Sequence, residues 1–193
     1  MTIASLFVGP LPALAYDRTG AVVYADYWAL GRNIGSLQHY NSYGNVCTNF
    51  ASHVMYDGEG LPYKTVDQYG NPLSSTDPRM WVWIPSGHTG SLSWTVATYL
   101  NQYFYSYIGV LDQPQLNWSG LAPGDFYFMD LEHANHPTHV RVWIGYADEY
   151  DINGNPTGGQ YFVADQHTTD RYHIGYLVGW NVNTDLVWKI HLL

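Results

Sequence analysis

The single cysteine of the chain, Cys47, stands where a turn-forming run gives way to a run with helical spacing, in the stretch YGNVCTNFASHVM at 43–55. A thiol in the first turn of a helix is close to unpaired backbone N–H groups and to the positive end of the helix dipole, which favour the thiolate. The thiolate is the nucleophilic form, so this position suits covalent catalysis. A free cysteine is more often a small buried hydrophobe, and position alone does not choose between the two roles.

A nucleophilic cysteine needs a base, and His139 is the histidine best placed to supply it. It opens the run HVRVWIGYA at 139–147, which has the composition of a β-strand. Because side chains alternate along a strand, His139 shares one face with Arg141 and Trp143, whereas the Val and Ile residues between them face a core. A histidine there can stand at the edge of a groove, although the pattern also suits a surface histidine.

The base needs an acceptor that orients its ring, and the strand expected at 160–168 carries two candidates. Asp165 and His167 are two residues apart and therefore face the same side of that strand. If the turn-rich segment 151–159 joins the two strands as a hairpin, either side chain can lie beside His139. The alternatives are a solvated charge for Asp165 and a hydrogen-bonded core or edge residue for His167.

Stabilisation of an oxyanion would fall to the backbone N–H of Cys47 together with a polar side chain. Asn45 and Asn49 flank the cysteine and are the candidates, although Asn49 can instead form a hydrogen bond within its own helical turn. Aromatic residues such as Trp94 and Trp143 can line a substrate groove, but packing in the core is the commoner role of such rings.

Two metal motifs compete with this interpretation, and both are weaker. His133, His136 and His139 form a run beside Glu132, but a proline within the run prevents a helix, and a strand would alternate their faces. The run DINGN at 151–155 resembles the start of a calcium loop but lacks the later glutamate. The sequence therefore predicts no metal and no cofactor.

The elements that must position these residues fall into two halves. Apolar residues recur with helical spacing at 16–31, 47–58 and 91–107, and Asp17 can cap the first of these helices. Strands are expected at 125–130, 139–147 and 160–168, with a short one at 80–85 and others near the C-terminus. Helices followed by strands favour an α+β domain in which N-terminal helices pack on an antiparallel sheet.

Composition limits the classes of protein to consider. The 193 residues suit one ordinary domain, which we place at 16–193. A net charge of −9 with only 7 Lys and Arg residues argues against a nucleic-acid partner, and no apolar run is long enough for a transmembrane helix. The apolar segment 1–15 is either an arm packed on the domain or the remnant of a signal peptide. Nothing in the sequence predicts the oligomeric state.

Six blocks of the sequence, in order, resemble the putative amidase domain family of bacterial proteins, which is similar to papain-like NlpC- and CHAP-type amidases and peptidases. The blocks are YDRTGAVVYADYWALGRN (16–33), NVCTNFASHVMYDG (45–58), SLSWTVATYLNQYF (91–104), LAPGDFYFMD (121–130), THVRVWIGY (138–146) and QHTTDRY (166–172). Together they extend over nearly the whole chain.

This resemblance implies a papain-like fold and a cysteine hydrolase that acts on amide or peptide bonds. It implies that Cys47 is the nucleophile, that His139 is the base, and that a third polar residue falls at Asp165 or His167. It also implies a bacterial protein that is secreted or in the cell envelope, with cell-wall peptide as its substrate.

Three features depart from the family pattern. Val46 stands where Asp is common, Arg141 interrupts the apolar histidine strand, and the segment 148–159 lengthens the hairpin. These departures keep a second interpretation open, in which the chain is an inactive module that binds peptide or glycan on the same fold.

Overall fold

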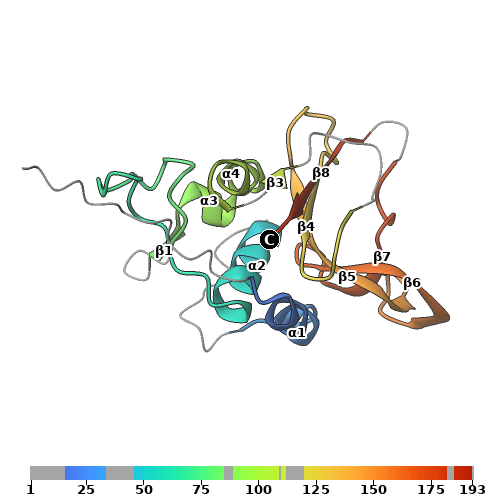
Figure 1. Ribbon diagram of the computed structural model, residues 1–193. Coiled ribbons are helices and arrows are strands. Elements are labelled where there is room, and N and C mark those ends of the chain that lie inside the picture. Colours follow the sequence, from blue (N-terminus) through green and yellow to red (C-terminus); the bar gives the residue numbers. More distant parts are fainter. Residues whose placement is uncertain are drawn as a thin grey trace, which may run out of the picture.

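The computed structural model describes residues 16–33, 46–84, 89–108, 110–111, 120–181 and 185–192. The expectations for the N-terminal arm at 1–15 and for Asn45 lie outside these ranges. Within them the fold is mixed α+β, as the sequence predicts, with helices gathered beside an antiparallel sheet (Figure 1).

The described residues contain four α-helices, two of which continue into a π-helical turn. They are α1 (Arg18–Trp28), α2 (Cys47–His53) with the turn η2 (Val54–Gly58), α3 (Leu92–Thr95), and α4 (Ala97–Tyr103) with the turn η4 (Phe104–Ile108). The predicted cap of α1 is confirmed, because the Asp17 side chain accepts a hydrogen bond of 2.9 Å from the Gly20 N–H. The predicted helix 91–107 is interrupted, because Val96 has extended backbone angles that separate α3 from α4.

The main sheet contains six strands in the order β3-β8-β4-β5-β6-β7, and neighbouring strands run antiparallel. They are β3 (Val110–Leu111), β4 (Phe126–Met129), β5 (His139–Tyr150), β6 (Pro156–Gln166), β7 (Arg171–Gly175) and β8 (Val187–His191). A separate two-stranded ribbon joins β1 (Trp83–Ile84) to β2 (Thr89–Gly90). The predicted strands are present, but β5 and β6 extend further into the hairpin than expected, and β6 ends at Gln166, so that His167 and Thr168 lie in a turn and not in the strand predicted at 160–168.

Each face of the sheet is covered by its own cluster of buried side chains. The helix-side face includes Val140 and Val142 and packs against residues of α1, α2 and α4. The far face includes Tyr127, Trp143 and Ala164, which belong to a smaller cluster. The alternation predicted for the strand at 139–147 is therefore confirmed up to Trp143.

A bulge in β5 sets its register with β6. On the hairpin side of the bulge, Gly145 pairs with Val163. On the other side Trp143 pairs with Ala164, which leaves Ile144 as an extra residue in β5. Gly145 has a φ of +104°, an angle that a residue with a Cβ atom rarely adopts. One glycine thus permits a one-residue shift in the pairing of the two longest strands.

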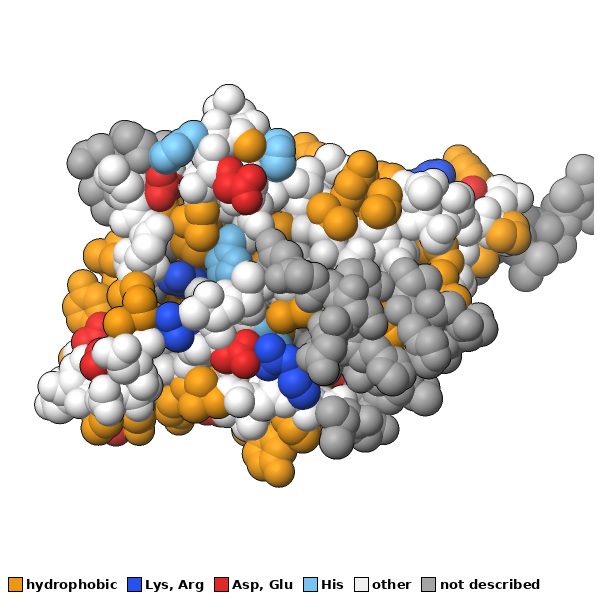
Figure 2. Space-filling model, turned by 180° about the vertical axis from the view of Figure 1, so that it is seen from behind, with side chains coloured by type: hydrophobic (Ala, Val, Ile, Leu, Met, Phe, Trp, Pro, Cys, Tyr) orange, Lys and Arg blue, Asp and Glu red, His pale blue; other side chains and the backbone are white. Residues whose placement is uncertain are grey.

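The described helices include none that is long and apolar enough to cross a membrane. On the face shown in Figure 2, hydrophobic side chains are spread among acidic and basic ones, and the basic side chains of described residues form only small groups.

Candidate active site

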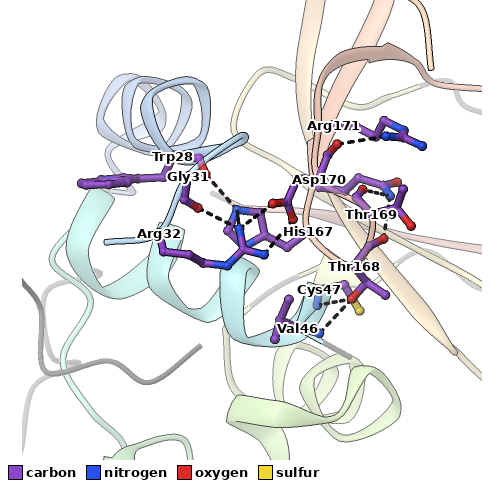
Figure 3. A network of polar contacts seen from close by, with 11 residues as sticks. Trp28, Gly31, Arg32, Val46, Cys47, His167, Thr168, Thr169, Asp170 and Arg171 are labelled. Carbon is purple, nitrogen blue, oxygen red and sulfur yellow. Dashed lines mark hydrogen bonds and ion pairs between the residues drawn. The ribbon is translucent and has the colours of Figure 1, made fainter. Parts of the chain in front are cut away.

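Cys47 is the first residue of α2, and the turn that follows β6 caps this helix. Val46, at the N-cap position, gives the helix no side-chain hydrogen bond. Instead, the Oγ1 of Thr168 accepts hydrogen bonds from the backbone N–H groups of Val46 (2.8 Å) and Cys47 (3.1 Å) (Figure 3). A residue 121 positions later in the chain therefore satisfies N–H groups that the start of the helix leaves unpaired.

The capping turn has a strained backbone that other contacts hold in place. Thr168 and Thr169 have φ angles of +62° and +66°, which are unfavourable for β-branched residues. The Nε2 of Gln166 donates hydrogen bonds to the carbonyls of Thr168 (3.3 Å) and Thr169 (3.0 Å). Gln166 thus fixes the turn that presents the Thr168 hydroxyl to the start of α2.

A two-pronged ion pair also joins this turn to the segment that follows α1. The guanidinium of Arg32 donates to both carboxylate oxygens of Asp170, over 2.8 and 2.9 Å (Figure 3). Paired hydrogen bonds of this kind fix orientation as well as distance. The turn is therefore held at the same time by β6 and by the segment that follows α1.

His139 is the first residue of β5, and its imidazole is bound to the same glutamine. The His139 Nε2 lies 3.2 Å from the Gln166 Oε1, and the Nε of Arg141 also donates to that oxygen. Arg141 has no acceptor atom, and the Gln166 Nε2 already faces two carbonyls, so Oε1 must be the acceptor. The hydrogen-bond network therefore assigns the ring hydrogen of neutral His139 to Nε2 and leaves the Nδ1 lone pair available.

The thiol of Cys47 contacts β5 at the residue that follows His139. Helix α2 packs against β5, and Cys47 and Val140 belong to the same buried cluster. The backbone N–H of Val140 lies within hydrogen-bonding reach of the sulfur. The starts of α2 and β5 thus lie side by side, with Cys47 packed on the helix-side face and the His139 ring turned to Gln166 on the other face.

Burial shifts the pKa values of both groups away from the charged forms. Burial raises the pKa of the Cys47 thiol, and hydrogen bonds from Val140 and Thr48 lower it by less. Burial, together with the positive charge of Arg141, lowers the pKa of His139 to about 3. The sequence led us to expect a lowered thiol pKa at the helix start, whereas the loss of solvent raises it here. Near neutral pH the two side chains are a thiol and a neutral imidazole.

Asp165 and His167, the two expected partners of His139, lie on the helix-side face instead. Asp165 pairs with Val142 and accepts a hydrogen bond of 2.7 Å from the backbone N–H of His173. The His167 Nε2 lies 2.8 Å from the Trp28 carbonyl. The expectation of a contact with His139 is wrong, because the bulge at Ile144 turns Gln166, not its neighbours, toward the far face.

Asn49 and Trp94 both lie in the core. Trp94 is fully buried, and its indole N–H donates a hydrogen bond of 2.6 Å to the Asn49 Oδ1. The Trp94 ring packs among other aromatic rings, including Trp81 at 4.8 Å between centroids. The proposed substrate role of Trp94 is therefore corrected to a packing role, and Asn49 supports that packing. Asn45, the other oxyanion candidate, is outside the described residues.

The histidine run at 133–139 does not assemble as a metal site. His133 lies 3.4 Å from Asp185, and His136 lies 3.1 Å from the hydroxyl of Thr98. His139 is turned to Gln166. The three side chains therefore have different partners, and His133 and His136 lie in the irregular segment before β5 rather than in a strand.

Sequence reasoning missed Gln166, Thr168 and the role of Arg141. All three occur in blocks quoted above for the family resemblance, and the first two belong to QHTTDRY. Arg141 looked like an interruption, but its guanidinium also donates to the carbonyls of Tyr176 (3.3 Å) and Val178 (2.8 Å). The one available clue was Gly145, since a glycine inside a strand pattern often indicates a bulge.

Comparison with known proteins gives one finding. The model of the family described as putative amidase domain matches residues 15–190. No curated protein and no solved structure matches the chain. The matched segment contains the cysteine helix, the histidine strand and the capping turn, and it covers most of the chain. The chain therefore belongs to the putative amidase domain family.

Proposed function

We propose that this protein is a cysteine-dependent amidase or peptidase, with Cys47 as the nucleophile and His139 as the base. Two contacts carry the proposal. The Nε2–H of His139 is hydrogen-bonded to Gln166, and the Cys47 thiol lies against Val140, the residue that follows His139 in β5. Membership of an amidase family supports amide hydrolysis, and the cysteine mechanism is the finer part of the proposal.

In this mechanism His139 works as a neutral base at its Nδ1. It takes the proton of the Cys47 thiol as the sulfur attacks the amide carbonyl. The imidazolium that forms keeps its hydrogen bond to Gln166, and Nδ1 then protonates the leaving amine. Water, deprotonated by the same nitrogen, hydrolyses the thioester and releases the acid.

The backbone N–H of Cys47 supplies one donor for the oxyanion in this scheme. That N–H is bound to the Thr168 hydroxyl at 3.1 Å. Substrate binding would therefore exchange one oxygen acceptor for another at the same N–H group. Because the second acceptor gains negative charge only during the reaction, the exchange favours the transition state over the bound substrate.

The substrate class and the fold relationship complete the proposal. We place the protein with papain-like hydrolases, because it has a cysteine at a helix start and a histidine at the start of an antiparallel strand, the two features that the sequence resemblance implies. The substrate we favour is a peptide or amide bond in bacterial cell-wall peptide. Such a substrate implies action in the cell envelope or outside the cell.

The test uses the fact that the chain has one cysteine. The protein is incubated with peptide amides and with cell-wall peptide fragments, and released amine is measured alongside the intact mass of the protein. We expect turnover and a thioester adduct in the wild type, and neither in Cys47→Ala. His136→Gln, which removes an exposed histidine, is the matched control and should turn over normally.

A second candidate is a module that binds peptide or glycan without turnover. The observation in its favour is that the thiol is buried and its backbone N–H already has an acceptor. In that case ligand binding survives Cys47→Ala and no adduct forms with any amide. Amine release that depends on Cys47 excludes this candidate.

A further inference from the structure

Asp26, Asp165 and His173 converge at a place that the proposed hydrolysis does not use. They come from α1, β6 and β7, and one oxygen or nitrogen atom of each lies within 4.8 Å of the others. Asp165 and His173 are buried, whereas Asp26 is about one-third exposed and leaves the cluster open to solvent.

The imidazole of His173 presents a lone pair to this cluster. Its Nδ1 lies 3.1 Å from the carbonyl of Asp148, which can only accept, so Nδ1 carries the ring hydrogen of the neutral form. Its Nε2 lies 3.0 Å from the Oδ1 of Asp26: in the neutral ring two acceptors face each other there, and in the protonated ring the two groups form an ion pair. The backbone of His173 has a φ of +47°, so the ring is held there at a cost in strain.

The carboxyl group of Asp165 is also incompletely satisfied. Its Oδ1 accepts the His173 N–H at 2.7 Å, but its Oδ2 is buried and has no hydrogen-bond partner in the described part of the chain. Burial raises the pKa of Asp165, and the nearby carboxylate of Asp26 raises it further. When Asp165 is ionised and His173 is neutral, two carboxylate oxygens and the Nε2 lone pair face one another, and a cation would complete them.

We propose that Asp26, Asp165 and His173 bind a divalent transition-metal ion of the zinc class. One imidazole nitrogen and two carboxylate oxygens are ligands that zinc prefers. The hydrogen bond from Nδ1 to the Asp148 carbonyl is the outer contact that a metal-bound histidine usually makes.

The geometry is close to what such an ion requires. Tetrahedral zinc with ligands at about 2.1 Å holds the ligand atoms about 3.4 Å apart. The Nε2 of His173 and the Oδ1 of Asp26 are already 3.0 Å apart, and all three atoms lie within 4.8 Å. Of the three side chains Asp26 is the most exposed, so its carboxylate can adjust toward an ion. The ion would link α1 to two strands and leave a fourth position for water.

The test measures zinc binding and is independent of hydrolysis. Chelator-treated protein carrying Cys47→Ser, which removes the competing thiol, is titrated with zinc by calorimetry. We expect one equivalent to bind, and we expect Asp26→Ala to weaken binding by about tenfold or more. Asp57→Asn is the matched control, because Asp57 pairs with His53 at 2.7 Å elsewhere in the molecule and should leave binding unchanged.

Cobalt provides a second measurement on the same proteins. The cobalt-loaded Cys47→Ser protein should show the visible absorption of a low-coordinate site, and Asp26→Ala should lose it. The proposal is overturned if no equivalent of zinc binds, or if Asp26→Ala binds zinc as tightly as the Asp57→Asn control. In that case a shared proton, rather than a metal, neutralises the cluster.

Discussion

Replacing His139 by glutamine should change how the stability of the protein depends on pH. The wild-type imidazole is buried beside Arg141, which together lower its pKa to about 3 from the usual 6.5. Between these values the unfolded chain binds a proton that the folded chain does not, so the free energy of unfolding falls as the pH falls. Glutamine does not titrate, and its amide can still donate to Gln166.

The size of the effect follows from the two pKa values. With a His139 pKa of 6.5 in the unfolded state and about 3 in the folded state, proton binding to the unfolded chain lowers the free energy of unfolding. The reduction is about 0.2 kcal/mol at pH 7 and about 2.7 kcal/mol at pH 4.5. The wild type should therefore lose about 2.5 kcal/mol relative to His139→Gln over this range. That loss is a large fraction of the stability of an ordinary domain.

The assay is urea unfolding of both proteins at several pH values, compared by subtraction. Subtraction is needed because other buried groups act with the opposite sign. Burial raises the pKa of Glu59 to about 9, so that its folded form holds a proton that the unfolded chain releases. His136→Gln is the control for loss of an exposed histidine. A difference between wild type and His139→Gln that stays constant from pH 7 to 4.5 would refute a neutral, buried His139.

Three further substitutions test the contacts around the site. Gln166→Ala removes the acceptor that orients His139, so kcat for amide hydrolysis should fall about a hundredfold with a changed pH profile, whereas a purely structural role would leave that profile unchanged. Thr168→Val removes the acceptor for two N–H groups at the start of α2 and should lower the free energy of unfolding in urea by about 1–2 kcal/mol. Thr168→Ser keeps the hydroxyl and should keep most of that stability. Gly145→Ala should cost about 1–3 kcal/mol because of its φ of +104°, and an equal loss in the exposed control Gly159→Ala would contradict this reasoning.

Local pattern is enough to predict the elements and to identify the two candidate reacting groups. Helical spacing identified α1 and α2, and alternation identified β4, β5 and β6, because a buried face imposes its period on the sequence. Cys47 and His139 were found as a lone thiol at a helix start and a histidine at a strand start. Each of these features depends on residues that are neighbours in the chain.

Chain position could not predict the protonation states. A helix start favours a thiolate, but the pKa of Cys47 is raised because α2 is buried against β5. Desolvation depends on every atom packed around the sulfur, and those atoms come from distant parts of the chain. For the same reason the cluster of Asp26, Asp165 and His173 is visible only after α1, β6 and β7 are assembled.

The partner of His139 was decided by a single extra residue. If the pairing of Tyr146 with Phe162 continued without a bulge, Arg141 would lie opposite His167, and the odd-numbered residues of β6 would face His139. The bulge at Ile144 shifts the pairing by one residue, so that the even-numbered Gln166 faces the imidazole of His139. The sequence by itself determined the strands and their alternation, which are local. Only the tertiary structure decided which face of one strand meets which face of the next, because a one-residue shift in register exchanges every contact across the pair.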